Sequence, residues 1–328
     1  MISCDKCSKP TVTFIRYSGA HLCNAHFIEF VNKRVKKEIG KQCKLPNDAK
    51  LAVALSGGKD STLALYMLKK IFEEHRNLEI IAITIDEGIK GYRPGSIKAA
   101  EKTCKELGVE HHLTSFTDRL GFTLDSIKPY VGELTPCTYC GVFRRFCLNS
   151  LAKELDATRL VMGHNLDDMA QSIIMNIFKG DPQKLARLGP HKHVQPGLVP
   201  RLVPLRTIPE KESYLYTMLI GLKIYDKECP YAIFAQRGQF RDMLAHAEEA
   251  TPGSRHAILS FYDQTIDAIS QKFAPAVLNN CEQCGEPTNQ KLCKTCVLRN
   301  ELLIKMGNKI PNPKLQNTNN TKLDNFLK

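Results

Sequence analysis

The sequence predicts an α/β protein with a parallel β-sheet and a small metal-binding module at each end of the chain. Short apolar runs alternate with helical patterns through the middle of the chain, which is typical of a parallel sheet covered by helices on both faces. Cysteines gather in paired sets near the two ends. With 328 residues and 43% hydrophobic content, the chain is large enough for one main domain with small appendages.

The predicted elements of the body follow one another in regular order. Short apolar runs predict buried strands at residues 51–55, 80–85, 109–113 and 160–162. Helical patterns follow them at residues 61–71, 97–107, 142–155 and 167–178. The pattern is mostly helical from Glu210 to Ser270. Ligands of parallel sheets bind at the carboxyl ends of the strands, so we expect a site where the polar loops follow these runs.

The two terminal cysteine sets have the spacing of closed zinc sites. The first set is a C-x2-C pair followed after fifteen residues by a C-x2-H pair, made of Cys4, Cys7, Cys23 and His26. The second set is two C-x2-C pairs separated by eight residues, made of Cys281, Cys284, Cys293 and Cys296. Four ligands with no vacancy suit structural, tetrahedral Zn²⁺. Redox chemistry fits less well, because the pairs come doubled.

Charge and cysteine content limit which partners and which cellular compartment we expect. The 46 basic and 34 acidic side chains give a net charge of +12, which favours a polyanionic partner or is a generically basic surface. No apolar run approaches the roughly 20 residues that span a bilayer, and the N-terminus lacks a secretory signal. We therefore expect a cytoplasmic protein without membrane contact. Thiols stay reduced there, so Cys43, Cys104 and Cys147, outside the clusters, are predicted as small core residues.

Residues 56–62, Ser-Gly-Gly-Lys-Asp-Ser-Thr, stand between a buried strand and a helix. The glycines let backbone amides approach phosphate oxygens at a helix N-terminus. Ser56 and Ser61 add hydroxyl groups, Lys59 adds charge, and Asp60 is suited to Mg²⁺. The spacing differs from the G-x-x-x-x-G-K-[ST] loop. The segment therefore predicts a phosphate site of another kind.

This loop resembles that of the PP-loop ATP pyrophosphatases, an adenine nucleotide alpha hydrolase-like fold whose members adenylate a substrate and release pyrophosphate. Three further motifs narrow the resemblance: Cys137-x2-Cys140-Gly141, Gly163-His-Asn-Leu-Asp-Asp168 and Glu228-Cys-Pro-Tyr231. With the terminal zinc sets, they resemble the tRNA 2-thiouridine synthetase group, which contains TtuA-like enzymes and cytosolic thiouridylase subunit one. The resemblance covers roughly residues 1–300.

The resemblance gives the three inner cysteines a place in the chemistry. Cys137, Cys140 and Cys229 do not close a zinc shell, but they can hold a [4Fe–4S] cluster by three irons and leave the fourth free for sulfide. Two alternatives stay open: a cluster-free enzyme with a cysteine persulfide and a resolving cysteine, and a third zinc with a distant ligand. Arg144 and Arg145 would stabilise the cluster or an RNA phosphate, or form a solvated face.

The remaining site residues are also carried by the resemblance. Gly57 and Gly58 complete the phosphate loop, while Ala54 and Ile85, at strand ends, would contact adenine through their backbones. Gly163 allows close approach to the nucleotide, and Asp168 would bind Mg²⁺ or assist proton transfer. Asp168 is alternatively an N-terminal helix acid.

The cysteine sets, the strand and helix pattern and the composition of the tail predict four parts of the chain. They are a zinc module with a basic helix at 1–45, a PP-loop catalytic domain with a helical C-terminal part at 46–275, a second zinc module at 276–305 and a flexible tail at 306–328. The basic helix, expected at 29–44, is either a solvated face or a surface for tRNA.

The implied activity is an ATP- and Mg²⁺-dependent tRNA-uridine 2-sulfurtransferase. Uridine O2 would be adenylated with release of pyrophosphate, and sulfide held on the cluster would then displace AMP. The target base must leave its stack, which suits a tRNA loop, and we expect the wobble uridine. The implied partners are tRNA, a donor (sulfide or a thiocarboxylated ubiquitin-like protein) and a second copy of the chain. A PP-loop amide ligase using ammonia and a non-catalytic RNA-binding module are the rival interpretations.

Overall fold

The structure is a computed structural model and describes residues 2–190, 196–273 and 278–307. Its centre is a five-stranded parallel sheet with the strand order β5-β4-β3-β6-β7. The strands are β3 (Lys50–Ala54), β4 (Glu79–Asp86), β5 (Glu110–Ser115), β6 (Arg159–Val161) and β7 (Arg201–Leu202). The predicted parallel α/β fold is therefore confirmed. The sequence did not reveal β7, because two residues carry too little pattern.

One face of the sheet is covered by four helices. They are α1 (Asn24–Gln42), α2 (Lys59–Ile71), α3 (Arg93–Leu107) and α9 (Glu210–Leu219). The side chains of Leu51 and Val53 on β3 share a buried core with Leu63 and Leu68 on α2. Helix α2 follows β3 through the 56–58 loop, so the burial of its apolar face fixes where its N-terminus lies.

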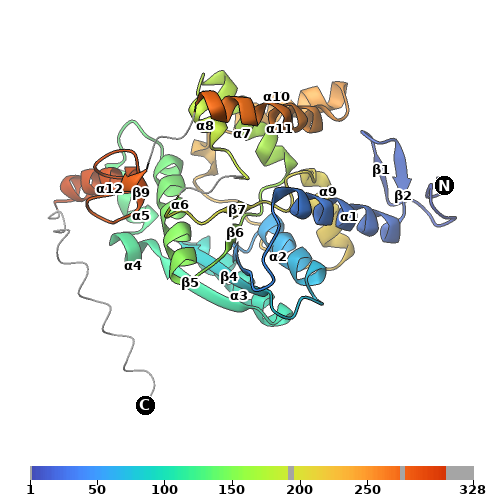
Figure 1. The fold of residues 1–328 in the computed structure, drawn as a ribbon, viewed down its shortest axis with the longest axis horizontal. Helices are drawn as coiled ribbons and strands as arrows, with labels where there is room; N and C mark the ends of the chain where they lie inside the picture. Colours follow the sequence, from blue (N-terminus) through green and yellow to red (C-terminus); the bar gives the residue numbers. More distant parts are fainter. Residues whose placement is uncertain (1, 191–195, 274–277, 308–328) are drawn as a thin grey trace, which may run out of the picture.

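The opposite face carries the helix with two of the inner cysteines. This layer contains α4 (Phe116–Leu120), α5 (Leu124–Ile127), α6 (Pro136–Glu154) and α12 (Lys294–Lys305), with a short turn, η1 (Lys128–Tyr130), after α5. Ile81 and Ile83 on β4 pack with Phe143 and Cys147 on α6. Helix α12, drawn in orange-red in Figure 1, packs against the outer side of the green helix α6.

A third group of helices lies beyond the carboxyl edge of the sheet. It contains α7 (Leu166–Phe178), α8 (Pro182–Ala186), α10 (Gly238–Ala250) and α11 (Ser254–Lys272). Leu166 and Ile173 on α7 pack with Leu259 and Tyr262 on α11. Residues 220–231 and the turn η2 (Ala232–Phe234) connect α9 to this group.

The two terminal modules lie at opposite sides of the molecule (Figure 1). The first contains the hairpin β1 (Thr13–Ile15) and β2 (Ala20–Leu22), and the second contains β8 (Asn279–Asn280) and β9 (Pro287–Thr288). Phe27 and Val31 on α1 join the same core as Leu51. The first module is thus packed on the body, although the division of the chain into four parts remains a prediction.

Most helices begin earlier than the apolar pattern predicted. Helix α1 starts at Asn24 rather than 29, because the Cys23–His26 turn is itself the first turn, and α6 starts at Pro136 rather than 142. Proline is favoured at the first helical position, because a backbone N–H there would have no hydrogen-bond partner within the helix. The apolar pattern does not reveal these first turns, because their cysteine, histidine and proline side chains do not follow the helical spacing of core residues.

The isolated cysteines and the helix lengths can be compared with expectation. Cys104 and Cys147 are buried in the core as predicted, while Cys43 caps the C-terminus of α1 and is half-buried. In the described part of the chain, every helix is too short or too polar to cross a bilayer. Of the predicted tail at 306–328, residues 308–328 lie outside the described residues.

Candidate active site

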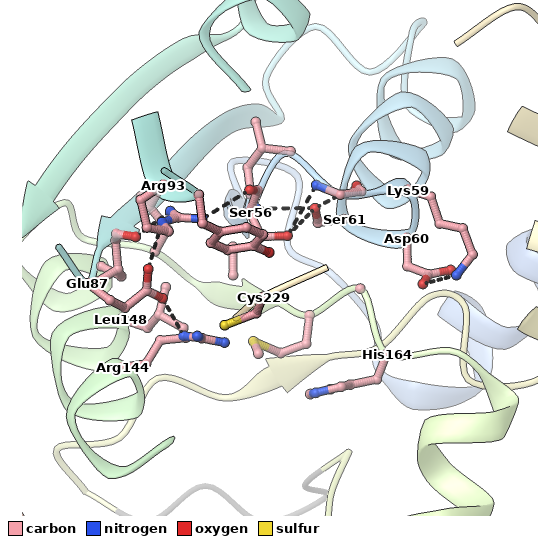
Figure 2. Close-up of a pocket in the computed structure, with 18 residues that line it drawn as sticks. Ser56, Lys59, Asp60, Ser61, Glu87, Arg93, Arg144, Leu148, His164 and Cys229 are labelled. Atoms are coloured by element: carbon pink, nitrogen blue, oxygen red, sulfur yellow. Dashed lines mark hydrogen bonds and ion pairs between the residues drawn. The ribbon is translucent and has the colours of Figure 1, made fainter. Parts of the chain in front are cut away.

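The sheet order creates a gap for a ligand between β3 and β6. The chain continues from β3 toward β5 on one side and from β6 to β7 on the other. Loops that diverge at such a switch point leave a crevice at the carboxyl edge. A cavity of about 360 Å³ occupies this position (Figure 2). Its lining includes the predicted residues Ala54, Ser56, Gly58, Lys59, Asp60, Ser61, Ile85, Gly163 and Cys229.

The backbone of the 56–58 loop is held against two neighbouring segments. Gly57 has φ +86°, and a Cβ there would lie 2.2 Å from the Ser96 carbonyl oxygen. A Cβ on Gly163 would lie 2.8 Å from the Ser61 amide nitrogen. The Ser56 amide donates to Ser61 Oγ over 3.1 Å. Only glycines allow this close packing, which leaves the N-terminus of α2 open toward the cavity and suited to phosphate.

Asp60 has the properties of a residue that could bind Mg²⁺. Lys59 Nζ lies 2.8 Å from Asp60 Oδ2 and 2.9 Å from Glu210 Oε1. Asp60 Oδ1 is buried and has no hydrogen-bond partner among the described residues. Burial raises the pKa of Asp60, Lys59 opposes this rise, and the Asp168 carboxylate adds to it. An oxygen left unpaired beside a second carboxylate fits a hard cation.

Asp168 lies on α7 near Asp60 but outside the cavity lining. Its Oδ2 accepts a hydrogen bond from the Asn165 backbone amide over 3.2 Å. Asn165 Oδ1 accepts one from the Asp168 backbone amide over 3.0 Å, so the pair forms a capping box. Its Oδ1 pairs with Arg237 over 3.1 Å. Asp168 is therefore a helix cap in this structure, and its role toward Mg²⁺ stays a prediction. Asp167 pairs with Arg255 over 3.0 Å and acts structurally.

The sequence reasoning missed an ionic network on the cavity wall, in which Glu87 and Arg93 are buried and Arg144 is exposed. Glu87 is 2% exposed and lies 2.7 Å from Arg93 Nε and 2.6 Å from Arg144 Nε. Arg93 also donates to the Ser56 carbonyl over 3.2 Å. The dashed lines in Figure 2 follow this path from the phosphate loop to α6. An acidic residue directly after β4 was a usable signal, because it falls at the ligand-binding edge of the sheet.

The three inner cysteines approach the cavity from two segments. Cys137 and Cys140, three residues apart, occupy the first turns of α6 and share a face. Cys137 donates to the Tyr231 carbonyl over 3.1 Å, and Arg144 donates to Cys140 Sγ over 3.2 Å. Cys229 lines the cavity on the side where Arg144 also points (Figure 2). Of the two arginines considered, Arg144 contacts Cys140 and Glu87 at the site, while its side chain stays 47% exposed.

The spacing of this trio fits an inorganic core better than a single ion. In the described part of the chain, only the two terminal sets bring three or more metal-ligand atoms within 4.8 Å of one another. The sulfurs of Cys137, Cys140 and Cys229 do not all lie within that distance, which disfavours one shared ion and agrees with a cluster in which each thiolate would bind a different iron. Burial raises the pKa of the Cys140 thiol to about 11, and Arg144 opposes this rise. Arg144 and the N-terminus of α6 thus favour a thiolate there.

The terminal sets come together as their spacing predicted. Cys4 Sγ and Cys23 Sγ lie 3.3 and 3.4 Å from His26 Nδ1, and Cys7 Sγ lies 3.7 Å from Cys23 Sγ. In the second set, Cys284 Sγ lies 3.5 Å from Cys293 Sγ, and the Cys293 amide donates to Cys281 Sγ over 3.2 Å. Together with Cys296, the second set also has its ligand atoms within 4.8 Å of one another. Both sets suit a four-coordinate metal ion.

Two family models match the chain. One, described as a PP-loop domain, matches residues 30–205, and the other, described as the N-terminal LIM domain of the 2-thiouridine synthetase TtuA, matches residues 3–28. The first match spans the sheet with the cavity, and the second spans the first cysteine set.

Relatives with known names match nearly the whole chain. The tRNA 2-thiolation protein NcsA of Haloferax volcanii is 38% identical over 90% of this chain and 98% of its own length. The tRNA-5-methyluridine(54) 2-sulfurtransferase of Pyrococcus horikoshii is 30% identical over 90% of this chain and 93% of its own. The U34-tRNA thiolase NcsA of Methanococcus maripaludis, solved with its [4Fe–4S] cluster, matches with a TM-score of 0.80 and 34% identity over 95% of this chain and 98% of its own. The chain belongs to the PP-loop family of tRNA 2-thiolation proteins.

Proposed function

We propose that this protein is a tRNA-uridine 2-sulfurtransferase that activates its target with ATP and Mg²⁺. The observation that carries the proposal is the convergence of the PP-loop and Cys229 on one cavity. The similarity to thiolation proteins over nine-tenths of the chain supports the same activity. An amide ligase would need the phosphate loop alone and gives the three cysteines no task.

The nucleotide half of the reaction is assigned to the β3–α2 loop. The amides at the start of α2 and Lys59 would hold the phosphates, and Asp60 with Asp168 would hold Mg²⁺. Gly163 leaves room for the nucleotide, and Ala54 and Ile85 border the cavity where adenine would lie. Uridine O2 then attacks the α-phosphorus, pyrophosphate leaves, and C2 becomes open to attack, since AMP is a far better leaving group than oxide.

The sulfur half is assigned to Cys137, Cys140 and Cys229. These thiolates would hold a [4Fe–4S] cluster, which when bound supplies the site that carries sulfide. Arg144 donates to Cys140 Sγ, which favours the thiolate against the effect of burial, and pairs with Glu87 on its other side. Attack of sulfide on C2 expels AMP and leaves 2-thiouridine, with no net change of oxidation state. A cysteine persulfide remains the alternative sulfur carrier.

The wider partners are proposed on the same basis. We keep the wobble uridine as the target, because the Methanococcus relative is named as a thiolase of uridine 34, whereas the Pyrococcus relative is named for uridine 54. Zinc is proposed for both terminal sets, because four soft ligands gather in each. Sulfide or a thiocarboxylated ubiquitin-like protein as donor, a homodimer and a cytoplasmic location complete the proposal.

Cys229→Ala provides the test. In anaerobically purified protein we expect about four iron and two zinc ions per chain. The variant should lose the iron, keep the zinc and lose tRNA thiolation, while pyrophosphate release from ATP and tRNA persists. Cys43→Ala, outside all three sets, is the matched control. Full thiolation by the Cys229 variant would refute the assignment of the cysteines, and thiolation without iron in the wild type would favour the persulfide.

A further inference from the structure

Residues 220–231, called the Cys229 segment below, connect α9 to η2 without regular secondary structure. Such a segment fixes a side chain poorly unless tertiary contacts hold it. Two tyrosines on either side of Cys229 make these contacts. One binds the segment to the layer of α6, and the other binds it to the phosphate loop.

Tyr231 is the contact on the α6 side. It is 7% exposed, its hydroxyl donates to Asp125 Oδ1 over 2.7 Å, and its carbonyl accepts from Cys137. The Ala232 amide in turn donates to the Cys229 carbonyl over 2.9 Å. This end of the segment therefore moves with the helix that carries the other two cysteines.

Tyr225 is the contact on the nucleotide side. Its amide donates to the Gly57 carbonyl over 2.9 Å, so the segment is bonded directly to the phosphate loop. Its ring packs on Gly95 in the first turn of α3, where a Cβ would lie 2.6 Å from Tyr225 Cε2. The ring also meets Tyr92, which lines the cavity, edge-on with a centroid separation of 5.7 Å.

The same turn of α3 supports the phosphate loop. Gly57 packs against the Ser96 carbonyl, and Arg93 donates to the Ser56 carbonyl. Gly95 therefore contacts the Cys229 segment, while Arg93 and Ser96 in the same turn contact the phosphate loop. A glycine inside a helix normally weakens it, so the space kept for the Tyr225 ring has a cost in helix stability that the packing must offset.

We propose that Tyr225 is a positioning residue that couples nucleotide binding at the phosphate loop to the placement of Cys229. This inference rests on the proposed function, because only that function gives Cys229 a role in sulfur transfer. Nucleotide that orders the loop also orders Gly57, and through the Tyr225 amide and ring it orders the segment four residues before Cys229. Sulfur transfer is thereby tied to an occupied nucleotide site.

Amide hydrogen exchange of the full-length, anaerobically purified protein tests this coupling. In the wild type, ATP with Mg²⁺ should slow exchange in residues 56–62 and also in 222–230. Tyr225→Ala keeps the backbone bond to Gly57 but loses the ring contacts, so residues 222–230 should exchange about tenfold faster and respond less to ATP, while 56–62 stay protected. Tyr225→Phe should behave as the wild type, because the ring and backbone contacts are kept. Thiolation should lose turnover in Tyr225→Ala with little change in KM for ATP.

Gly95→Ala is the second variant and displaces the ring without removing it. Alanine normally stabilises a helix interior relative to glycine, so a looser 222–230 segment in this variant cannot come from a weakened α3. The proposal falls if residues 222–230 keep their wild-type exchange and ATP response in Tyr225→Ala, or in Gly95→Ala where the first variant does not fold. Intact coupling in a protein that does not thiolate tRNA would refute the proposed function alone, and a wild type whose loop ignores ATP would refute both.

Discussion

At the scale of single residues, Asp60 is the side chain on which the proposed Mg²⁺–nucleotide site depends most. Its Oδ1 is buried without a partner among the described residues, beside the Asp168 carboxylate. Asp60→Asn removes the charge at nearly constant volume. We expect pyrophosphate release to fall by at least about 100-fold, the usual loss when one preorganised charge is removed from a reacting centre.

The measurement is pyrophosphate release with ATP and tRNA over a range of Mg²⁺ concentrations. Asp48→Asn, at an exposed position before β3, is the matched control and should leave the rate unchanged. Wild-type release with an unaltered Mg²⁺ dependence in the Asp60 variant would contradict the assignment of this carboxylate.

Residues were predictable where neighbours in the sequence act together. The 56–62 loop and both C-x2-C pairs of the second terminal set lie within a few positions, so their chemistry is visible as a motif. Glu87 and Tyr225 escaped, because each derives its role from residues on other elements: Glu87 from Arg144 and Tyr225 from Gly57. A single sequence carries no sign of such pairings.

At the scale of elements, the second metal module supports the cysteine-bearing helix. Leu298, Leu302 and Leu303 on α12 share a core with Phe143 on α6. Helix α12 begins at Cys293, a member of the metal set. Because binding energy of a structural metal is folding energy, loss of the metal should loosen α12 and expose the outer face of α6.

Cys293→Ser tests this dependence. We expect the zinc content to fall from two ions to one per chain and the Tm to fall by at least about 5 °C. Cys43→Ser, at the C-cap of α1, should change neither value. An unchanged Tm with one zinc lost would show that α12 packs without its metal. Helix boundaries near such modules are hard to predict for a related reason, since ligand turns replace the apolar pattern.

At the scale of the whole molecule, a half-buried histidine joins the first module to the body. Arg34 on α1 contacts His256 on α11 over 2.8 Å and Glu212 on α9 over 3.1 Å, and the ring of Tyr17 packs on His256. Burial, with Arg34 next in importance, lowers the pKa of His256 to about 4. The unfolded chain, with an ordinary histidine pKa near 6.5, therefore binds this proton more readily than the folded one.

The sign of the pH effect follows directly. Stability from the neutral histidine is complete above about pH 6.5 and is lost as the pH falls toward 4. At pH 5.5 this group should lower the free energy of unfolding by about 1.4 kcal/mol relative to pH 7.5. His256→Gln keeps an acceptor for Arg34 but does not titrate. Urea unfolding at both pH values should show a smaller loss in this variant, and an equal loss would exclude His256 as the source.

The separation of the phosphate loop from the inner cysteines has a consequence for how the catalyst can change. Under the proposed function, the segment after β3 would bind the nucleotide, whereas α6 and residues 220–231 would hold the sulfur carrier. If α6 and residues 220–231 were replaced by segments that hold another nucleophile, a different atom would attack the same activated uridine. Residues 220–231 are also bonded to the phosphate loop through the Tyr225 amide, so a replacement segment would have to keep this contact for activation and attack to stay linked.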